Sequence, residues 1–263
     1  FSFQQLDSFI RKLIDLGEKN YPIHLKLDTG MNRLGFIEEE IDNIISIIMS
    51  QPEVRVKSIF SHLAASDKSK HNDFTNQQIK LFKACANKLE KGLGYSVQKH
   101  ILNSAGIENF PEHQLDMVRL GIGVYGTSSS LNNLEPAGRL KTIITQIKYA
   151  PKGSSIGYSR SGFAEEDLTI AIIPIGYADG FSRKLSNGKG HVLINGKLAS
   201  VIGNVCMDMT LINVTDIQCE EGDEVIIFGI ERPIEDLAKE MGTISYEVMT
   251  SISQRVVRVY LED

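Results

Sequence analysis

The sequence predicts an α/β fold for the first half of the chain and a mainly β fold for the second. In roughly the first 130 residues, apolar runs of strand length alternate with segments of helical spacing, a pattern typical of parallel βα units. From about Gly138 onward, short apolar runs follow one another closely, with turn residues between them. The polar segment 127–139 has the composition of a loop, so we expect two domains, 1–133 and 134–263.

The first half predicts four parallel strands with helices between them. Apolar residues at helical spacing begin at Leu6, and Gly17 follows them as a typical helix C-terminal cap. The elements expected next are a strand at 21–30, a helix at about 38–51, a strand at 54–64, a helix capped by Asn72, and strands at 100–106 and 117–126. Four such strands form a small open sheet or half of a (β/α)₈ barrel, which needs eight. The pattern alone leaves both alternatives open.

The second half predicts closely spaced strands with few helices. Asn195-Gly196 lies between two alternating runs and predicts a hairpin with a type I′ turn. The strands expected are at 140–150, 168–178, 191–196, 197–205, 209–214 and 223–229, followed by short helices at 233–241 and 246–253 and a closing strand at 255–262. We therefore expect a mainly β domain.

Composition excludes several classes of partner. The chain has 28 Lys and Arg against 33 Asp and Glu, a formal charge of -5, which argues against nucleic acid and anionic membrane surfaces. Its apolar runs, such as residues 44–49, are far shorter than the ~20 residues of a membrane span. Three cysteines without CxxC or CxxH spacing predict neither a disulfide framework nor a metal site. We expect a cytoplasmic protein with a small-molecule partner.

Polar side chains follow each predicted parallel strand. In chain order they are Lys26, Asp28 and Thr29, then His62, then Asn103 and Ser104, and finally Arg119. The carboxyl ends of parallel strands meet at one edge of a sheet, so we expect these side chains to lie close together. Amide, hydroxyl, imidazole and guanidinium groups with few carboxylates suit an anionic, ring-bearing ligand such as a phosphorylated cofactor. The alternative for each residue alone is a structural hydrogen bond or ion pair.

The segment GIGVYG at 121–126 matches the pattern GxGxxG. A dinucleotide fingerprint should open a helix after a strand, whereas a Ser- and Asn-rich loop follows here, so we do not predict a dinucleotide site. Glycines at a strand end can still let backbone N–H groups approach a phosphate.

Eight segments together resemble the alanine racemase family, pyridoxal-phosphate enzymes of fold type III. In order they are HLKLDTGMNRLGF, FSHLAASD, LNSAG, MVRLGIGVYG, IGYSR, PIGYADGF, GNVCMDM and ISYEV. The resemblance implies an incomplete (β/α)₈ barrel of the TIM type that holds pyridoxal 5′-phosphate at its C-terminal mouth, followed by a mainly β domain. It also implies a homodimer with shared active sites that interconverts L- and D-alanine, supplying D-alanine for peptidoglycan.

The resemblance assigns cofactor contacts to seven residues. Those implied at the phosphate are Ser104, the backbone amides of Gly121 and Ile122, and Tyr246, with Asn103 close by; Arg119 is implied at the pyridine nitrogen, with His62 beside it. A guanidinium stays protonated and cannot give its proton to the ring, which leaves the ring a weaker electron sink than one facing a carboxylic acid. This favours racemisation over transamination.

The resemblance also implies residues that act on the substrate. Tyr158 matches the catalytic tyrosine, which reaches into the partner subunit's site, and Arg33 matches the arginine that bonds this tyrosine and the cofactor. Lys26 matches a lysine that is often carbamylated; without carbamylation it places a second positive charge beside Arg33. Tyr177 and the segment Cys206, Met207 and Asp208 match the substrate entrance and carboxylate region of the opposite subunit. We do not interpret Cys206 as a nucleophile.

The lysine that carries the cofactor and serves as the second base lies, in this family, in a motif resembling VKANAYGHG upstream of everything in this chain. No lysine of the sequence has that context. We therefore expect that about the first third of a racemase, with about four barrel strands, lies outside these residues and that this chain alone is inactive. The alternatives are a non-catalytic assembly module, or a racemase of serine or another small amino acid. A fused cell-wall ligase is also compatible with the sequence.

Overall fold

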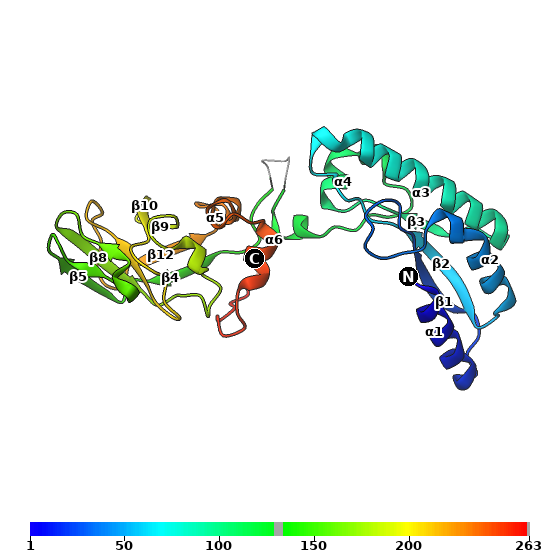
Figure 1. Ribbon diagram of the computed structural model, residues 1–263, viewed down its shortest axis with the longest axis horizontal. Coiled ribbons are helices and arrows are strands. Elements are labelled where there is room, and N and C mark those ends of the chain that lie inside the picture. The colour runs from blue at the N-terminus through cyan, green and yellow to red at the C-terminus, as the bar shows by residue number, and fades with distance from the viewer. Residues whose placement is uncertain (129–133, 262–263) are drawn as a thin grey trace. The chain divides into compact units, whose positions relative to one another are not determined.

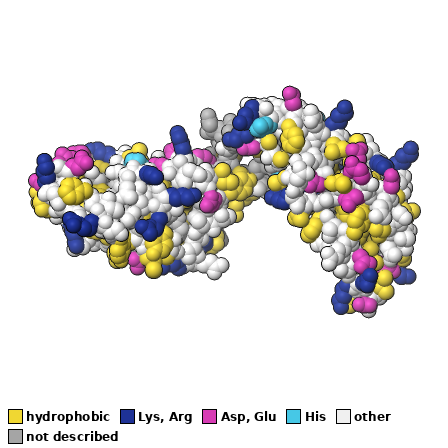
Figure 2. Space-filling model, in the orientation of Figure 1, with side chains coloured by type: hydrophobic (Ala, Val, Ile, Leu, Met, Phe, Trp, Pro, Cys, Tyr) yellow, Lys and Arg dark blue, Asp and Glu magenta, His cyan; other side chains and the backbone are white. Residues whose placement is uncertain are grey.

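The computed structural model describes residues 1–128 and 134–261, and these form two compact units (Figure 1). The first unit comprises residues 1–124 with Ser128, and the second comprises residues 125–127 with 134–261. Each unit is described by itself. On the face shown in Figure 2, acidic and basic side chains are interspersed on both units, in keeping with the small net charge of -5. In the described ranges, no helix combines the length and apolarity that crossing a membrane requires.

The first unit is a three-stranded parallel sheet covered by helices. The strands lie in the order β1 (Tyr21–Lys26), β2 (Val54–Phe60), β3 (Gln98–His100). The helices are α1 (Phe3–Leu16), α2 (Ile41–Ser50), α3 (Asn72–Leu93) and α4 (Ser104–Asn109), with short 3₁₀ turns at Glu38–Glu40, Ser69–His71, Pro111–His113 and Ile122–Tyr125. The predicted βα alternation is therefore present, and Gly17 ends α1 in the left-handed conformation at φ 70°. Asn72 is the first helical residue and His71 takes the cap position, one residue earlier than predicted.

The two faces of this sheet have different chemistry. One face packs on the helices: Leu25 of β1 and Ile59 of β2 join a core that includes Phe82 of α3. Beyond the register shift at Ile23 and His24, the side chains alternate, so the other face carries His24 and Lys26 of β1, Ser58 and Phe60 of β2, and His100 of β3. The strand register places these side chains next to one another across the sheet, because His24 pairs with Ser58, Lys26 with Phe60, and Phe60 with His100. The polar face is therefore built by strand alternation.

The predicted strand at 117–126 is wrong, and the one predicted at 100–106 overlaps β3 only at His100, because the helix α4 begins at Ser104. Two backbone hydrogen bonds, from Asp116 N to Lys99 O (3.1 Å) and from Arg119 N to Leu102 O (3.0 Å), hold the start of this segment beside β3 and the residues after it. The N–H groups of the glycines that follow donate to the Ser104 side chain instead of to a strand. The backbone then forms a 3₁₀ turn. The strand β3 stops early because the Asn103 side chain caps α4, accepting from Gly106 N at 2.9 Å.

The second unit is mainly β. A four-stranded sheet has the order β10 (Lys197–Ser200), β9 (His191–Ile194), β12 (Glu224–Phe228), β4 (Leu140–Ile143). A three-stranded sheet has the order β11 (Thr210–Asn213), β8 (Leu168–Ile173), β5 (Gln146–Ala150), and β6 (Ser155–Ile156) pairs with β7 (Gly162–Phe163). The helices are α5 (Ile234–Met241) and α6 (Ser245–Ser251), with 3₁₀ turns at Tyr158–Arg160 and Arg183–Leu185. Asn195 and Gly196 both have positive φ (48° and 77°), which confirms the predicted type I′ hairpin.

The predicted closing strand at 255–262 is wrong over its described part, 255–261; Glu262 lies outside the described residues, as do 129–133 of the predicted linker. The guanidinium of Arg258 donates to the carbonyls of Ile252, Ser253 and Val256, which holds the backbone in a turned path. The side chains that follow are exposed, Tyr260 by 86%. An apolar alternating run forms a strand only beside a hydrogen-bonded neighbour, and no described strand pairs with it.

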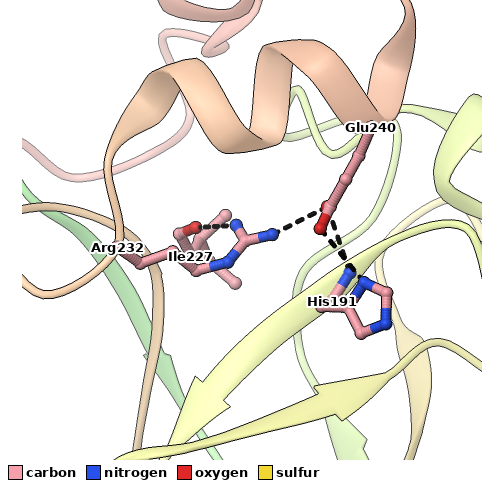
Figure 3. Close-up of polar contacts among 4 residues, drawn as sticks. All are labelled: His191, Ile227, Arg232 and Glu240. Carbon is pink, nitrogen blue, oxygen red and sulfur yellow. Dashed lines mark hydrogen bonds and ion pairs between the residues drawn. The ribbon is translucent and has the colours of Figure 1, made fainter.

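An ion pair between buried Arg232 and partly buried Glu240 joins α5 to two strands of the second unit (Figure 3). Arg232 is 3% exposed; its guanidinium donates to the carbonyl of Ile227 in β12 at 2.5 Å and to Glu240 Oε2 at 2.7 Å. Glu240 also accepts from the backbone N–H of His191 at 3.2 Å and lies 3.0 Å from Nδ1 of the same residue. The carboxylate therefore fixes the end of α5 against the start of β9.

Candidate functional site

Three predicted site residues gather on the polar face of the first sheet. The ammonium of Lys26 lies 5.8 Å and the guanidinium of Arg119 lies 5.3 Å from the ring centroid of Phe60. Burial, followed by the charges of Arg119, Arg33 and Lys26, lowers the pKa of His62 to about 4. Burial, Arg33 and Arg119 also lower the pKa of Lys26, against an opposing effect of Asp28. The strand ends thus form a strongly cationic surface with a neutral imidazole.

Arg33 reaches this surface because the loop after β1 is tightly folded. Asp28 Oδ1 accepts from the N–H groups of Gly30 (2.9 Å) and Asn32 (3.0 Å), and its own N–H donates to Phe36 O at 2.8 Å. Gly35 has φ +127°, and a Cβ there would lie 2.6 Å from Asp28 N. Glycine is therefore required where the loop closes on itself.

Arg119 is held by hydrogen bonds from both terminal nitrogens. Nη1 donates to His100 Nδ1 at 2.5 Å and to His100 O at 3.2 Å, while Nη2 donates to Ser61 O at 2.5 Å and to Ile101 O at 3.2 Å. Among the described residues, Nε has no acceptor. The guanidinium is fixed between the ends of β2 and β3 with one donor free.

A chain of hydrogen bonds continues from Arg119 across the polar face. Arg119 can only donate, so His100 Nδ1 accepts, and the neutral ring carries its proton on Nε2. That N–H donates to Ser58 Oγ at 3.1 Å, and the Ser58 hydroxyl in turn donates to His24 Nδ1. Burial, Arg119 and His24 lower the pKa of His100 to about 4. We did not predict Ser58, His100 or His24 as site residues. The sequence signal for them was their spacing: each lies two residues before Phe60, Leu102 or Lys26, and residues two apart on a strand share one face.

The Ser104 hydroxyl lies where backbone donors converge. Its Oγ accepts from Gly121 N at 2.8 Å and from Gly123 N at 3.2 Å. A Cβ at Gly123 would lie 3.5 Å from this oxygen and 2.8 Å from Leu120 Cδ1. Asn103 Oδ1 accepts from Ser66 Oγ at 2.8 Å as well as from its helix cap. Predicted phosphate-site residues Asn103, Ser104 and Gly121 are thus adjacent, and Ile122 follows Gly121 in the turn.

These residues fit pyridoxal phosphate. The ring nitrogen needs a donor that stays protonated, and Nε of Arg119, which has no acceptor among the described residues, is one. The phosphate needs hydroxyl and N–H donors; the Ser104 hydroxyl is one, and the N–H groups of Gly121 and Gly123, which here donate to Ser104 Oγ, converge on the same place. Among the described side chains, no group of three or more His, Cys, Asp or Glu is placed to hold a metal ion.

The remaining predicted residues belong to the second unit, where two segments are brought together. The N–H of Tyr177 donates to Cys206 O at 3.0 Å, and the N–H of Ala178 donates to Met207 O at 2.9 Å. A Cβ at Gly176 would lie 2.4 Å from Cys206 O, so only glycine allows this approach. Burial, followed by the charge of Asp208, raises the pKa of the Cys206 thiol. A raised pKa disfavours the thiolate form that a nucleophile needs.

Tyr158 lies in an exposed 3₁₀ turn of the second unit. Its side chain is 70% exposed, and its carbonyl accepts from Asn204 Nδ2 at 3.2 Å, which links the turn to the segment leading to Cys206. The next two residues, Ser159 and Arg160, have φ of 57° and 52°. Tyr246 lies in α6 and is 47% exposed.

Acid is expected to destabilise the first unit because two histidines are held neutral. His62 and His100 have folded pKa values of about 4 against an ordinary value of 6.5, so the unfolded chain binds more protons between these limits. The stabilisation is complete above pH 6.5 and is lost as pH falls toward about 4. Urea denaturation over this range should show a falling free energy of unfolding, with a shallower slope for His62→Gln. The exposed His71→Gln variant is the control; equal slopes for His62→Gln and wild type would contradict the assignment.

Comparison with known proteins gives one family across the chain. Residues 1–129 match the alanine racemase N-terminal domain, and residues 137–260 match the alanine racemase C-terminal domain. Alanine racemase 2 of Caldanaerobacter subterraneus is 41% identical over 254 residues, covering 92% of this chain and 65% of that protein. Alanine racemase of Desulfovibrio desulfuricans is 36% identical over 269 residues, covering 100% and 72%. The chain thus spans about two thirds of the length of these relatives.

Solved structures agree. Alanine racemase from Streptomyces lavendulae matches with a TM-score of 0.92 and 31% identity, covering 100% of this chain and 72% of that one. Alanine racemase from Bartonella henselae with covalently bound pyridoxal phosphate matches with a TM-score of 0.89 and 29% identity, covering 99% and 72%. The predicted fold class is confirmed, and the open three-stranded sheet corresponds to part of the family's barrel domain. The chain belongs to the alanine racemase family.

Proposed function

We propose that the protein containing this chain interconverts L- and D-alanine with pyridoxal 5′-phosphate. The observation that carries the proposal is the fixed guanidinium of Arg119, which has a free donor on a cationic surface beside the Ser104 cradle. When bound, the cofactor supplies an electron sink that makes the α-proton of an amino acid acidic. Residues 1–133 form the cofactor-binding part and residues 134–263 the mainly β domain.

The residues of the first unit bind and orient the cofactor. Arg119 donates to the pyridine nitrogen, with His62 beside it, and keeps its own proton, which favours racemisation over transamination. Ser104 and the amides of Gly121 and Ile122 hold the phosphate, with Asn103 supporting the turn. Tyr246 is a further residue that the family resemblance assigns to the phosphate.

Inversion of a stereocentre needs a base on each side of the α-carbon. Tyr158 serves one side, in the active site of a partner subunit, so the working unit is a homodimer. Its exposed position supports this role because the phenol is available to another chain. Arg33 binds the phenol and orients it for proton transfer.

Lys26 and the entrance segments complete the site. The lowered pKa of Lys26 increases the fraction of its amine that is neutral, and the neutral amine is the form that carbon dioxide carbamylates. The resulting anion offsets the charges of Arg33 and Arg119. The substrate bound in the opposite subunit is received by Tyr177 and residues Cys206, Met207 and Asp208, which bind its carboxylate. The backbone hydrogen bonds between these two segments support a shared role at the substrate entrance.

We propose that the second base is a cofactor-bearing lysine outside these 263 residues, because no lysine of the sequence has the context that the family resemblance implies. The full reading frame, purified with pyridoxal phosphate from the cytoplasmic fraction, is expected to form D-alanine from L-alanine, while residues 1–263 alone form none. Chiral chromatography of the product measures this. Failure of the full protein, or turnover by residues 1–263 alone, would contradict the proposal. Faster turnover of serine would reassign the substrate, and a stable dimer without turnover would indicate an assembly module.

A further inference from the structure

We propose that Gln78 of α3 is a positioning residue: its side-chain amide fixes the backbone after β2 and thereby the placement of His62 on the cationic surface. The structural part of this inference stands on hydrogen bonds, and only its consequence for the cofactor rests on the function proposed above. Gln78 itself lies on the helix that covers the opposite face of the sheet, so it does not touch the surface it organises.

The oxygen and the nitrogen of the Gln78 side-chain amide both form hydrogen bonds with the backbone of the segment 62–64. Its Oε1 accepts from the backbone N–H of Ala64 at 3.0 Å, and its Nε2 donates to the backbone carbonyl of His62 at 3.4 Å. The side chain is buried, with 1% exposure. Only an amide side chain offers one donor and one acceptor side by side, so the two contacts together require an amide on a side chain as long as that of glutamine.

The same side chain also lies against the loop that follows β1. A Cβ built at Gly30 would be 3.6 Å from Gln78 Cγ and 3.2 Å from Cζ of Phe74. Gly30 belongs to the tight turn whose N–H groups are held by Asp28 and which leads to Arg33. Gln78 therefore lies between the two loops that carry Arg33 and His62.

The surroundings of Gln78 favour an apolar residue at its position. Ile79 and Phe82 of the same helix are buried in the core of the first unit. A polar amide placed there costs free energy unless it is fully hydrogen-bonded. Thr75, one turn earlier, is also fully buried, and its hydroxyl has no hydrogen-bond partner among the described residues. The two buried polar groups thus differ: the Gln78 amide joins loop segments, whereas the Thr75 hydroxyl joins nothing described.

The position of His62 determines its protonation state. Its ring is partly shielded from water and faces Arg119, Arg33 and Lys26, which together keep it neutral near neutral pH. A second positive charge beside Arg119 would compete for the place of the ring-bearing cofactor. If the amide of Gln78 is lost, the segment 62–64 relaxes, the imidazole gains water and moves away from the cations, and its pKa rises toward the ordinary value of 6.5.

The test is a proton NMR titration of the histidine rings in the full protein without cofactor. The variant is Gln78→Met, which has similar length and loses both hydrogen bonds. Assignments come from His62→Gln and His100→Gln. At pH 6, His62 is expected to be about 1% protonated in wild type, and its midpoint should rise by about one unit or more in Q78M. The midpoint of His100 should stay in place, because the two described hydrogen bonds of Gln78 go to residues 62 and 64 and not to β3.

Thr75→Val is the matched control, since it changes a buried polar side chain of the same helix face without removing a described hydrogen bond. It should leave both midpoints unchanged. If Q78M fails to fold, Gln78→Asn provides a second variant: its neutral amide is one methylene shorter and cannot span both contacts. Hydrogen exchange of the Ala64 amide is an independent measurement, with an expected acceleration of about tenfold in either variant.

The outcomes are separable from those of the proposed function. A rise in the His62 midpoint alone supports the positioning role even if the protein does not racemise alanine. An unchanged His62 midpoint and unchanged Ala64 exchange in a folded variant would overturn it even if racemisation is intact. Equal movement of His62 and His100 would also overturn it, because that result indicates general loosening of the unit.

Discussion

Replacing Tyr158 with phenylalanine is expected to lower kcat for alanine racemisation by about a hundredfold to ten thousandfold, the usual contribution of a positioned general base. The reason is that inversion needs proton transfer on both sides of the α-carbon, and phenylalanine keeps the ring but has no proton to exchange. Chiral analysis of product formed by the full protein measures the loss. The KM should change less, because Tyr158 has no proposed contact with the substrate carboxylate.

Tyr149→Phe is the control for this substitution. Tyr149 lies on β5 of the same unit and is similarly exposed, at 66%, but it has no proposed role in the site. The second readout is exchange of the α-proton in heavy water. With one base removed, one enantiomer should still exchange at its α-carbon while inversion is lost. Full racemisation by Y158F, or equal loss in Y149F, would remove Tyr158 from its catalytic role.

Replacing Glu240 with leucine is expected to lower the free energy of unfolding of the second unit by about 2–3 kcal/mol, less than the ~3–5 kcal/mol of a fully buried ion pair, because the Glu240 side chain is 21% exposed. Arg232 is 3% exposed and would keep only its bond to the Ile227 carbonyl. His191 would lose both contacts to the carboxylate. Urea denaturation followed by circular dichroism measures the change.

The double variant Arg232→Met with Glu240→Leu separates the effect of an uncompensated charge from that of lost packing. Replacing both members of a buried pair with apolar residues is often close to neutral, so the double variant should recover most of the stability. Asp236→Leu, at an exposed position of the same helix, should cost about 1 kcal/mol or less. A small change in the free energy of unfolding in E240L, or a double variant no more stable than E240L, would show that this ion pair does not hold α5 against the strands.

Features that depend on neighbouring residues could be predicted from the sequence. The helix ending at Gly17 and the hairpin at Asn195-Gly196 follow from backbone conformations that few other residues adopt, and both are present. The segments 117–126 and 255–261 have the same strand-like alternation as true strands, yet neither is a strand. Strand formation needs a partner at a distance in sequence, and alternation alone does not reveal whether that partner exists.

The site shows the same division. Strand ends and family motifs were enough to predict that Lys26, His62 and Arg119 would lie together, because parallel strands bring their carboxyl ends to one edge. The partners that hold these groups were not predictable. Ser58 and His100 are ordinary strand residues until register aligns them with Arg119, and Gln78 resembles any polar residue of a helix until folding buries it beside residues 62–64.

The sequence by itself determined the family, the α/β and β halves and the identity of the charged groups at the strand ends, because these depend on composition, periodicity and motif order. Only the tertiary structure decided which donors face which acceptors. It gave the Arg119 guanidinium four acceptors, with none for Nε in the part of the chain that the structure describes, and it placed the Gln78 amide between two loops. The physical reason is that hydrogen bonds require ångström-scale approach between groups far apart in the chain, and packing, rather than local propensity, sets those distances.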